Sequence, residues 1–553
     1  MIFSHVHELP AKLSMGQTQS QSMLLIEGII VRHNIEINQC EMMFKLTNAT
    51  IIFVSLVLVR AATCYKILVI FGHPGKSHYD VFKPLFQELG ERGHNITIIS
   101  HVETEGDIKN GRDVLLSKQP LTNFLDLNMF PGNRLQKYAE THLIAHFGSI
   151  TCPSSLQSAE LQRFLLEDHN FDVILTEFFN TNCFYGLITK YKAPFIGLSS
   201  CSMMTWHADW FGSPVNPSYI PSIYMAHPVP MTFLHRAENT LMHLVGIMWY
   251  KLFMERPGRE LSLKYTGYEP ADPYNASLLL LNTHYSLHGA RPLTPSIVEV
   301  GGIHVASKKP KRLPKELEKW ANESTSGLIY FSLGSLAKGH TFPQPQLTSF
   351  LKVLSKRPER VLWKWEIDSM KDKPDNVMLT KWAPQFDILC HPNTKLFISH
   401  GGLLGTTEAV HCGVPMLVMP QFGDQTLNAQ AVKSHEAGVI LALREATEEK
   451  ISQALDVALS KRTTQNARKL SERFRDREVP PIQTAVYWIE HIARNKGGQH
   501  MRSAAIGMPF YQYFLLDVIL FYLLIVFVFV FVVHRTCTKA VSLCVRRRKE
   551  KTS

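Results

Sequence analysis

The chain has 553 residues, 45% of them hydrophobic and 19% charged, which is enough for two or more domains with sizeable cores. Its formal net charge is +11, but residues 534–553 hold seven Lys or Arg against one Glu and so carry +6 of it. The remaining body is only mildly basic and has no basic stripe interleaved with aromatic residues. Nucleic acid is therefore excluded as the expected partner.

The first 63 residues divide into two segments. Residues 1–42 show no clear pattern, so either Met42 or Met43 is the true start or this segment is an extension of unassigned role. Residues 43–63 combine Lys45, an apolar run and a stretch of small residues, which is the organisation of a secretory signal peptide. We therefore expect the mature chain to enter the secretory pathway.

The mature chain opens with the pattern of a parallel α/β domain. Residues 65–71 form an apolar run typical of a buried strand, and residues 80–92 have apolar side chains on one helical face before Gly93. Further strands are predicted at 95–100, 171–176 and 194–198. The order strand, helix, strand predicts a doubly wound sheet, and we assign a Rossmann-like domain to residues 64–305.

Residues 201–254 differ in composition from the rest of this domain. They are rich in Met, Trp, Phe, Tyr and Pro and show little alternation of apolar and polar residues. Such side chains suit an adaptable pocket for an apolar small molecule. A plain helical core explains the composition equally well, and both interpretations stand at this point.

A second α/β series follows a linker. We place the linker at 306–326 because residues 308–314 are basic and contain two prolines. Apolar runs at 327–335, 361–365 and 439–441 predict strands of a second Rossmann-like domain, over residues 327–508. Two prolines at 480–481 break the chain before a last predicted helix at 484–495.

The stretch 395–413 predicts a strand, a glycine turn and a helix. Gly401 and Gly402 permit a tight turn that approaches a ligand closely, and Gly413 ends the helix that begins at Leu403. The N-terminus of such a helix offers free N–H groups and a positive dipole end to an anion.

A further strand, at 414–419, leads to two polar residues. Asp424 and Gln425 follow its carboxyl end, where open α/β sheets bind their ligands. Together with the glycine turn before it, this arrangement predicts a site for a nucleotide diphosphate.

The C-terminal region predicts a membrane anchor. Residues 511–533 are an almost unbroken apolar run, and a membrane-spanning helix needs about 20 residues. Asp517 is the one charge in the run, near its first end, where its cost is smaller. The basic tail after it fits a cytosolic flank, so we place the transmembrane helix at 509–533 and the tail at 534–553, with a buried soluble helix as the alternative.

These motifs resemble the signature of the UDP-glycosyltransferases, a family that includes the UDP-glucuronosyltransferases. The shared residues are Trp382-Ala-Pro-Gln385, His400-Gly-Gly402, Glu408, Pro415, Pro420 and Asp424-Gln425. An ordinary α/β turn accounts for the glycines but not for the whole series. The resemblance implies two Rossmann-like domains facing a cleft, the GT-B fold, with the first domain binding an acceptor and the second a UDP-sugar.

The resemblance also implies roles at the donor site. Trp382 would stack on uracil, Gln385 would contact the uridine and Glu408 would bind the ribose hydroxyls. The diphosphate would be bound by Ser335, His400, Gly402 and Gly405. The sugar hydroxyls would be bound by Asp424 and Gln425. Transfer would invert the anomeric centre and would need no metal and no cofactor beyond the UDP-sugar.

The candidate catalytic pair is His78 and Glu177. His78 belongs to a Lys-Ser-His element that resembles the place where the family carries its catalytic histidine. Glu177 follows a predicted strand at the point where the family has an acidic residue that orients the histidine. The nearby His73 is the rival base.

Two other nucleotide-dependent classes are excluded. A P-loop would need glycine at position 70, which is Ile70, and no Gly-x-Gly-x-x-Gly follows the first strand. A catalytically inactive protein that binds a UDP-sugar or a lipophilic molecule on the same fold stays open as the alternative function.

The donor sugar is glucose or glucuronate. Leu403-Leu404-Gly405-Thr406-Thr407 resembles the insect branch, whose members mostly use glucose, because vertebrate members usually carry Asn where Leu404 stands. The expected acceptors are small lipophilic phenols, alcohols and xenobiotics, conjugated for detoxification. The resemblance also allows a homo-oligomer.

The remaining signals concern compartment and modification. Nine cysteines are scattered without Cys-x-x-Cys pairs, so the sequence signals neither a zinc site nor a disulfide framework. Asn275 and Asn322 are the better glycosylation acceptors, since Asn95 leads into a predicted strand. Lys549 and Lys551 resemble a dilysine retrieval signal, so we expect a single-pass type I protein of the endoplasmic reticulum membrane with a luminal catalytic body.

Overall fold

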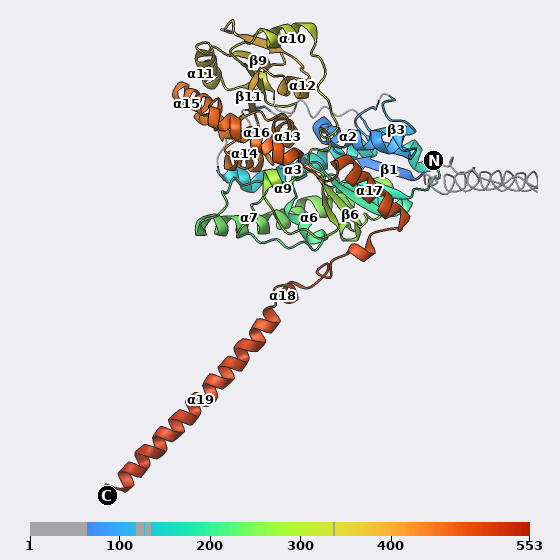
Figure 1. The fold of residues 1–553 in the computed structure, drawn as a ribbon. Helices are drawn as coiled ribbons and strands as arrows, with labels where there is room; N and C mark the ends of the chain where they lie inside the picture. Colours follow the sequence, from blue (N-terminus) through green and yellow to red (C-terminus); the bar gives the residue numbers. More distant parts are fainter. Residues whose placement is uncertain (1–63, 105, 118–125, 128–133, 336–337, 553) are drawn as a thin grey trace, which may run out of the picture. The chain divides into compact units, whose positions relative to one another are not determined.

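A computed structural model of the chain describes residues 64–104, 106–117, 126–127, 134–335 and 338–552 (Figure 1). The extension predicted for 1–42 and the signal peptide predicted for 43–63 lie outside the described residues.

The first sheet contains seven parallel strands in the order β3-β2-β1-β4-β5-β6-β7. The chain runs outward from β1 to β3 and then returns to β4 on the other side, so the strand order reverses between β1 and β4. Ligands bind at such a switch point, outside the carboxyl ends of the strands. The strands are β1 Lys66–Phe71, β2 Asn95–Ser100, β3 Gly111–Leu115, β4 Val173–Glu177, β5 Phe195–Ser199, β6 Leu278–Leu281 and β7 Ile297–Glu299.

The second sheet repeats this plan with six parallel strands in the order β10-β9-β8-β11-β12-β13. Its switch point lies between β8 and β11. The prediction of two Rossmann-like domains is therefore confirmed. The strands are β8 Leu328–Ser332, β9 Arg360–Lys364, β10 Val377–Thr380, β11 Thr394–Ser399, β12 Met416–Val418 and β13 Gly438–Ile440.

Helices connect the strands and cover the faces of both sheets (Figure 1). Those of the first half are α2 Lys76–Glu91, α3 Arg134–Leu156, α4 Ala159–Leu166, α5 Tyr185–Tyr191, α6 Thr205–Trp210, α7 Phe233–Tyr250, α8 Arg256–Thr266 and α9 Tyr285–His288. Those of the second half are α10 Lys315–Asn322, α11 Gln344–Leu354, α12 Gln385–Leu389, α13 Leu403–Cys412, α14 Gln425–Ser434, α15 Glu448–Ala458, α16 Lys461–Arg475 and α17 Pro481–Arg494.

The last helix of the body, α17, packs on the first sheet although it follows the second in sequence. Its residues Ile482, Val486 and Ile489 share one core cluster with residues of α2 and β1, and each is at most 8% exposed. Burial of each such side chain contributes roughly 1.5–3 kcal/mol, so α17 binds the two halves together.

Several elements differ from the sequence predictions. Strands β3, β6, β7 and β10 and the long helix α3 were not anticipated, since short apolar runs do not separate strand from helix. The segment predicted as a linker contains α10. Helix α2 begins at Lys76 rather than at residue 80, because Gly75 serves as its N-cap. His78 therefore lies in the first helical turn and not in the loop before it.

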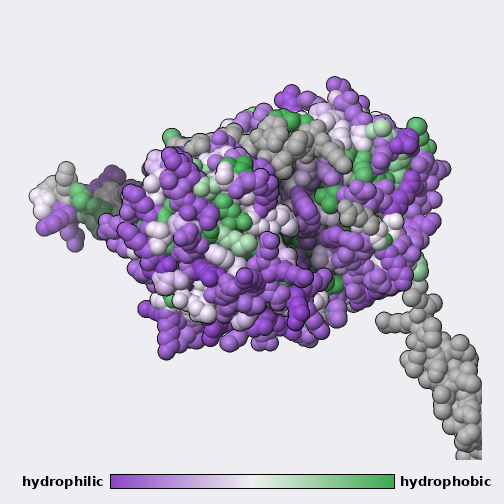
Figure 2. All heavy atoms as spheres, turned by 90° about the horizontal axis from the view of Figure 1, so that it is seen from above, coloured by the Kyte–Doolittle hydropathy of each residue, from purple (hydrophilic) through white to green (hydrophobic). Residues whose placement is uncertain are grey.

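The interpretation of residues 201–254 as core is confirmed for Met203 and Trp206, which belong to a buried cluster. Met204, Ile223 and Tyr224 belong to the same cluster and also line a cavity, and the role of an acceptor pocket stays a prediction. The outer face of α7 is apolar and exposed at Phe233, Leu234, Leu241, Leu244 and Met248. Elsewhere, the face of the molecule seen in Figure 2 is largely hydrophilic with small apolar areas.

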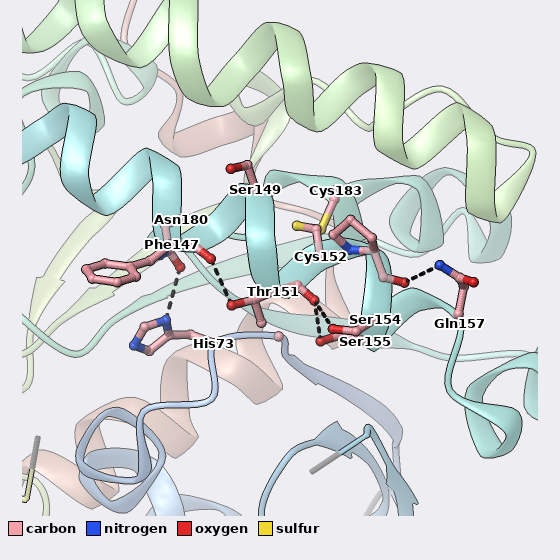
Figure 3. Close-up of a disulfide and its surroundings, with 12 residues drawn as sticks. His73, Phe147, Ser149, Thr151, Cys152, Ser154, Ser155, Gln157, Asn180 and Cys183 are labelled. Atoms are coloured by element: carbon pink, nitrogen blue, oxygen red, sulfur yellow. Dashed lines mark hydrogen bonds between the residues drawn. A yellow bond between two sulfur atoms is a disulfide. The ribbon is translucent and has the colours of Figure 1, made fainter. Parts of the chain in front are cut away.

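Two disulfides overturn the expectation from the cysteine spacing. Cys152 of α3 is bonded to Cys183, with a sequence separation of 31 and Cα atoms 6.2 Å apart (Figure 3). Cys390 is bonded to Cys412, at the end of α13, with a sequence separation of 22 and a Cα distance of 4.9 Å. No local motif announces either pair, because packing of distant segments brings the sulfurs together.

The C-terminal helix α19, Leu516–Glu550, contains a stretch long and apolar enough to cross a membrane, Leu516–Arg548. It is the one such helix among the described residues. A short helix, α18 Phe510–Tyr513, precedes it. The predicted span ended at Val533, but the helix continues through the basic tail because no Gly or Pro interrupts that tail.

Candidate active site

A cavity of about 830 Å³ lies between the two sheets, at the carboxyl ends of their strands. Its wall contains His78 from the first half and all nine predicted donor-site residues from the second. Glu177 lies behind His78 and is buried. The glycosylation candidates Asn275 and Asn322 are not part of the wall.

His78 and Glu177 meet at the switch point of the first sheet. His78 comes from the first turn of α2, directly after β1, and Glu177 is the last residue of β4. The His78 Nδ1–H donates to Glu177 Oε1 over 2.7 Å. The Ser200 hydroxyl lies 2.7 Å from the same Nδ1 and donates to Glu177 Oε1 over 3.1 Å. These contacts fix the ring so that Nε2 is the basic nitrogen.

Burial sets the charge of both groups. It lowers the pKa of His78 to about 4, so the imidazole is neutral near pH 7 and can accept a proton. It raises the pKa of Glu177 to about 7, since a carboxylate in an apolar interior loses its hydration. The Glu177 side chain is 0% exposed and Oε2 has no hydrogen-bond partner.

His73 lies beside this pair but has a different partner. Its Nδ1–H donates to Asn180 Oδ1 over 3.1 Å (Figure 3). Asn180 is itself oriented by donation to the Ile144 carbonyl at 3.0 Å. Burial lowers the pKa of His73 to about 3. The structure thus pairs the carboxylate with His78 and an amide with His73.

The switch point of the second sheet holds a histidine between two glycines. A side chain at Gly334 or at Gly402 would place its Cβ within 2.7 Å of the His400 ring, so it would displace the ring from this position. Burial lowers the pKa of His400 to about 4 and keeps the ring neutral. Ser335 borders the same part of the cavity.

A cation that the sequence analysis missed adjoins His400. Lys364, the last residue of β9, lines the cavity, and its Nζ donates to the Gly334 carbonyl over 2.7 Å. Its side chain is 10% exposed, and burial lowers its pKa. In the sequence, the position of Lys364 near the end of a predicted strand was the one feature that indicated a place at the site.

The same wall also carries Trp382, Gln385 and Glu408. Gln385 Nε2 donates to Glu408 Oε2 over 2.6 Å, and Gly405 leaves room for the Gln385 amide, which would lie 3.0 Å from an added Cβ. Burial raises the pKa of Glu408 to about 7. Trp382 is 66% exposed, so its indole face is open to a flat ring.

Asp424 and Gln425 lie at the start of α14. The Gln425 side-chain oxygen accepts the N–H groups of Gln421 at 2.8 Å and Phe422 at 3.3 Å, which leaves its amide NH₂ as the group able to donate to a ligand. Burial raises the pKa of Asp424 to about 6. Both side chains line the cavity.

Two parallel sheets with a cavity across both switch points make up the GT-B fold. Solved structures support this fold: spinosyn forosaminyltransferase SpnP matches with a TM-score of 0.54 and 16% identity, over 78% of this chain and 100% of that one. The glycosyltransferase VinC in complex with DTDP matches with a TM-score of 0.54 and 14% identity, over the same shares of both chains.

The chain belongs to the UDP-glycosyltransferase family. The family model described as UDP-glucoronosyl and UDP-glucosyl transferase matches residues 115–551. The chain is 36% identical to UDP-glycosyltransferase UGT5 of Dactylopius coccus, over 86% of this chain and 92% of that one. It is 31% identical to UDP-glucuronosyltransferase 1A3 of Rattus norvegicus, over 85% and 90% respectively.

Proposed function

We propose that this glycosyltransferase moves a hexosyl group, preferably glucose, from a UDP-sugar to the hydroxyl of a small lipophilic acceptor. The observation that carries the proposal is the contact of His78 with Glu177 over 2.7 Å, where His78 lines a cavity that also holds the UDP-glycosyltransferase donor motif and Glu177 lies behind it. An inactive binding protein has no need of a buried carboxylate behind a neutral histidine.

The reaction follows from the positions of these groups. His78 Nε2 takes the proton of the acceptor hydroxyl as the hydroxyl oxygen attacks the anomeric carbon of the donor sugar. The bond from that carbon to the diphosphate oxygen breaks, and UDP leaves with the electron pair. Glu177 stabilises the imidazolium that forms on His78. Attack from the face opposite the diphosphate inverts the anomeric centre.

The second half of the cavity supplies stabilisation for the leaving diphosphate. The N-terminus of α13 begins at Leu403, after the N-cap Gly402, and presents free N–H groups and a positive dipole end. His400 and Ser335 add hydrogen-bonding groups, and Lys364 adds a positive charge. Developing negative charge on a diphosphate is favoured by such fixed donors.

The apolar part of the first half suits a lipophilic acceptor. Leu143, Ile144, Phe179, Met204 and Ile223 line the cavity near His78. Burial of apolar surface drives binding there, and a hydroxyl is the one group that has to reach the histidine. Conjugation of such compounds for detoxification is the role that we propose.

The charge at the sugar end supports glucose as the donor sugar. Glucuronate needs a cationic partner for its carboxylate, whereas Asp424 presents an acid. Four of the lysines described on the cavity wall have side chains that face other groups: Lys76 contacts Asp80, Lys83 contacts Asp107, Lys308 lies over Phe386 and Lys364 contacts the Gly334 carbonyl.

We also propose that the body lies in the lumen of the endoplasmic reticulum, held by α19, with the tail in the cytosol. The two disulfides support an oxidising compartment, and the basic tail supports the cytosolic side. Glycosylation at Asn275 and Asn322 and retrieval through Lys549 and Lys551 belong to the same proposal.

The test is an initial-rate assay on microsomes that contain the full-length protein. UDP-glucose and UDP-glucuronate are supplied at equal concentration to a panel of phenols, and glycoside and free UDP are both measured. Faster glycoside formation from UDP-glucose supports the proposal. A clear preference for UDP-glucuronate contradicts the donor assignment, and absence of both transfer and donor hydrolysis supports an inactive binding protein.

A further inference from the structure

The first half of the molecule reaches the sugar end of the donor site through α3. Three hydrogen bonds join this helix to residues 421–426 of the second half. Gln136 Nε2 donates to the Gln421 carbonyl over 2.9 Å, and Lys137 Nζ donates to Thr426 Oγ1 over 2.8 Å. The Gly423 N–H donates to Glu140 Oε2.

Glu140 is the centre of this group. Its side chain is 2% exposed, and Lys137 Nζ lies 3.1 Å from Oε1. A buried carboxylate is expensive to desolvate unless it is paired, and here a lysine and a backbone N–H supply the partners. Burial nevertheless raises the pKa of Glu140. An apolar side chain could fill this space without the desolvation cost, so the carboxylate of Glu140 serves a purpose that depends on its charge and its hydrogen bonds.

The contacts of Glu140 act on the residues expected to hold the sugar. Gly423 immediately precedes Asp424 and Gln425, and it has φ +64°, so glycine makes this turn readily. The Gln425 side chain holds the N–H groups of Gln421 and Phe422 within this turn, and Glu140 holds the N–H of Gly423 from the other half of the molecule. Glu140 and Asp424 both line the cavity.

We propose that Glu140 is a positioning and selectivity residue for the donor sugar, and that Lys137 supports it. Glu140 holds the Gly423 N–H and thereby sets Asp424 and Gln425 against the hydroxyls of a neutral hexose. Its charge adds a second acid to the sugar end and so disfavours a uronate. Lys137 offsets this charge only in part, because Glu140 lines the cavity whereas Lys137 does not. The inference rests on the proposed hexosyl transfer and deepens it.

The test compares Glu140→Gln with the full-length parent enzyme in membranes. Glutamine keeps the shape and can still accept the Gly423 N–H, but it removes the charge. We expect the KM for UDP-glucose to rise about tenfold to hundredfold, as for loss of a charged hydrogen-bond partner, while UDP inhibits as strongly as before. The rate with UDP-glucuronate relative to UDP-glucose should increase. Lys137→Met should raise the KM for UDP-glucose by less and should lower the relative rate with UDP-glucuronate, because the charge of Glu140 is then unpaired.

Glu91→Gln is the matched control, because Glu91 is an exposed carboxylate of α2 that does not line the cavity. An unchanged KM and donor ratio in Glu140→Gln would overturn the inference, as would an equal weakening of UDP and UDP-glucose. If the parent enzyme itself prefers UDP-glucuronate, the donor assignment fails instead. Titration calorimetry with UDP and UDP-glucose measures the sugar contact even without turnover: equal losses for both ligands in the variant overturn the inference, and a loss confined to UDP-glucose supports it.

Discussion

Replacement of Glu177 by glutamine tests the catalytic pair most directly. The variant keeps the size of the side chain but removes the charge that faces the His78 imidazolium across 2.7 Å. Opposite charges about 4 Å apart at an effective dielectric constant of about 20 interact by about 4 kcal/mol. Since about 1.4 kcal/mol changes a rate tenfold, Glu177→Gln should lower kcat by about a thousandfold.

The assay measures kcat with saturating UDP-glucose and one phenol, together with UDP affinity and thermal unfolding. UDP affinity should not change, because Glu177 does not line the cavity. Stability should be equal or higher, since a buried carboxylate with an unpaired Oε2 becomes a neutral amide. A loss of kcat below about tenfold in a folded variant would refute the role of Glu177. Ser200→Ala is the graded comparison, with a smaller loss because Ser200 only assists the same contact.

Three further predictions concern the base, the pH dependence and the anchor. His78→Ala should lower turnover roughly 10²- to 10⁴-fold with UDP affinity nearly intact, and a loss confined to His73→Ala would move the role of base to His73. The pH profile of kcat/KM should rise through about pH 7, because Glu177 has a raised pKa of about 7 and must be ionised, whereas His78, with a pKa of about 4, is already neutral there. An inflection that stays near pH 7 in Glu177→Gln would assign the titration to another group. Deletion of all residues after Met508 should release the protein from carbonate-washed membranes, because α19 would be absent; retention would point to the exposed apolar face of α7 as a second membrane contact.

The donor half was largely predictable because its signals are local. The strand, glycine turn and helix of residues 395–413 occupy one continuous stretch, and Gly413 ends α13 in the left-handed conformation, as expected. Short-range rules of turn and cap chemistry act over a few residues and therefore can be read along the chain. The same holds for the apolar run that became α19.

Tertiary structure alone decided which distant residues meet. His78 and Glu177 were expected as a pair through family resemblance, but Ser200, 122 residues from His78, was not. Glu140 is 283 residues from Gly423, and nothing in the helical pattern of α3 marks it as a neighbour of the sugar end. The disulfide partner of Cys152 was equally hidden. Such contacts depend on the order of strands and the packing of helices, which place segments side by side without leaving a periodic trace in the sequence.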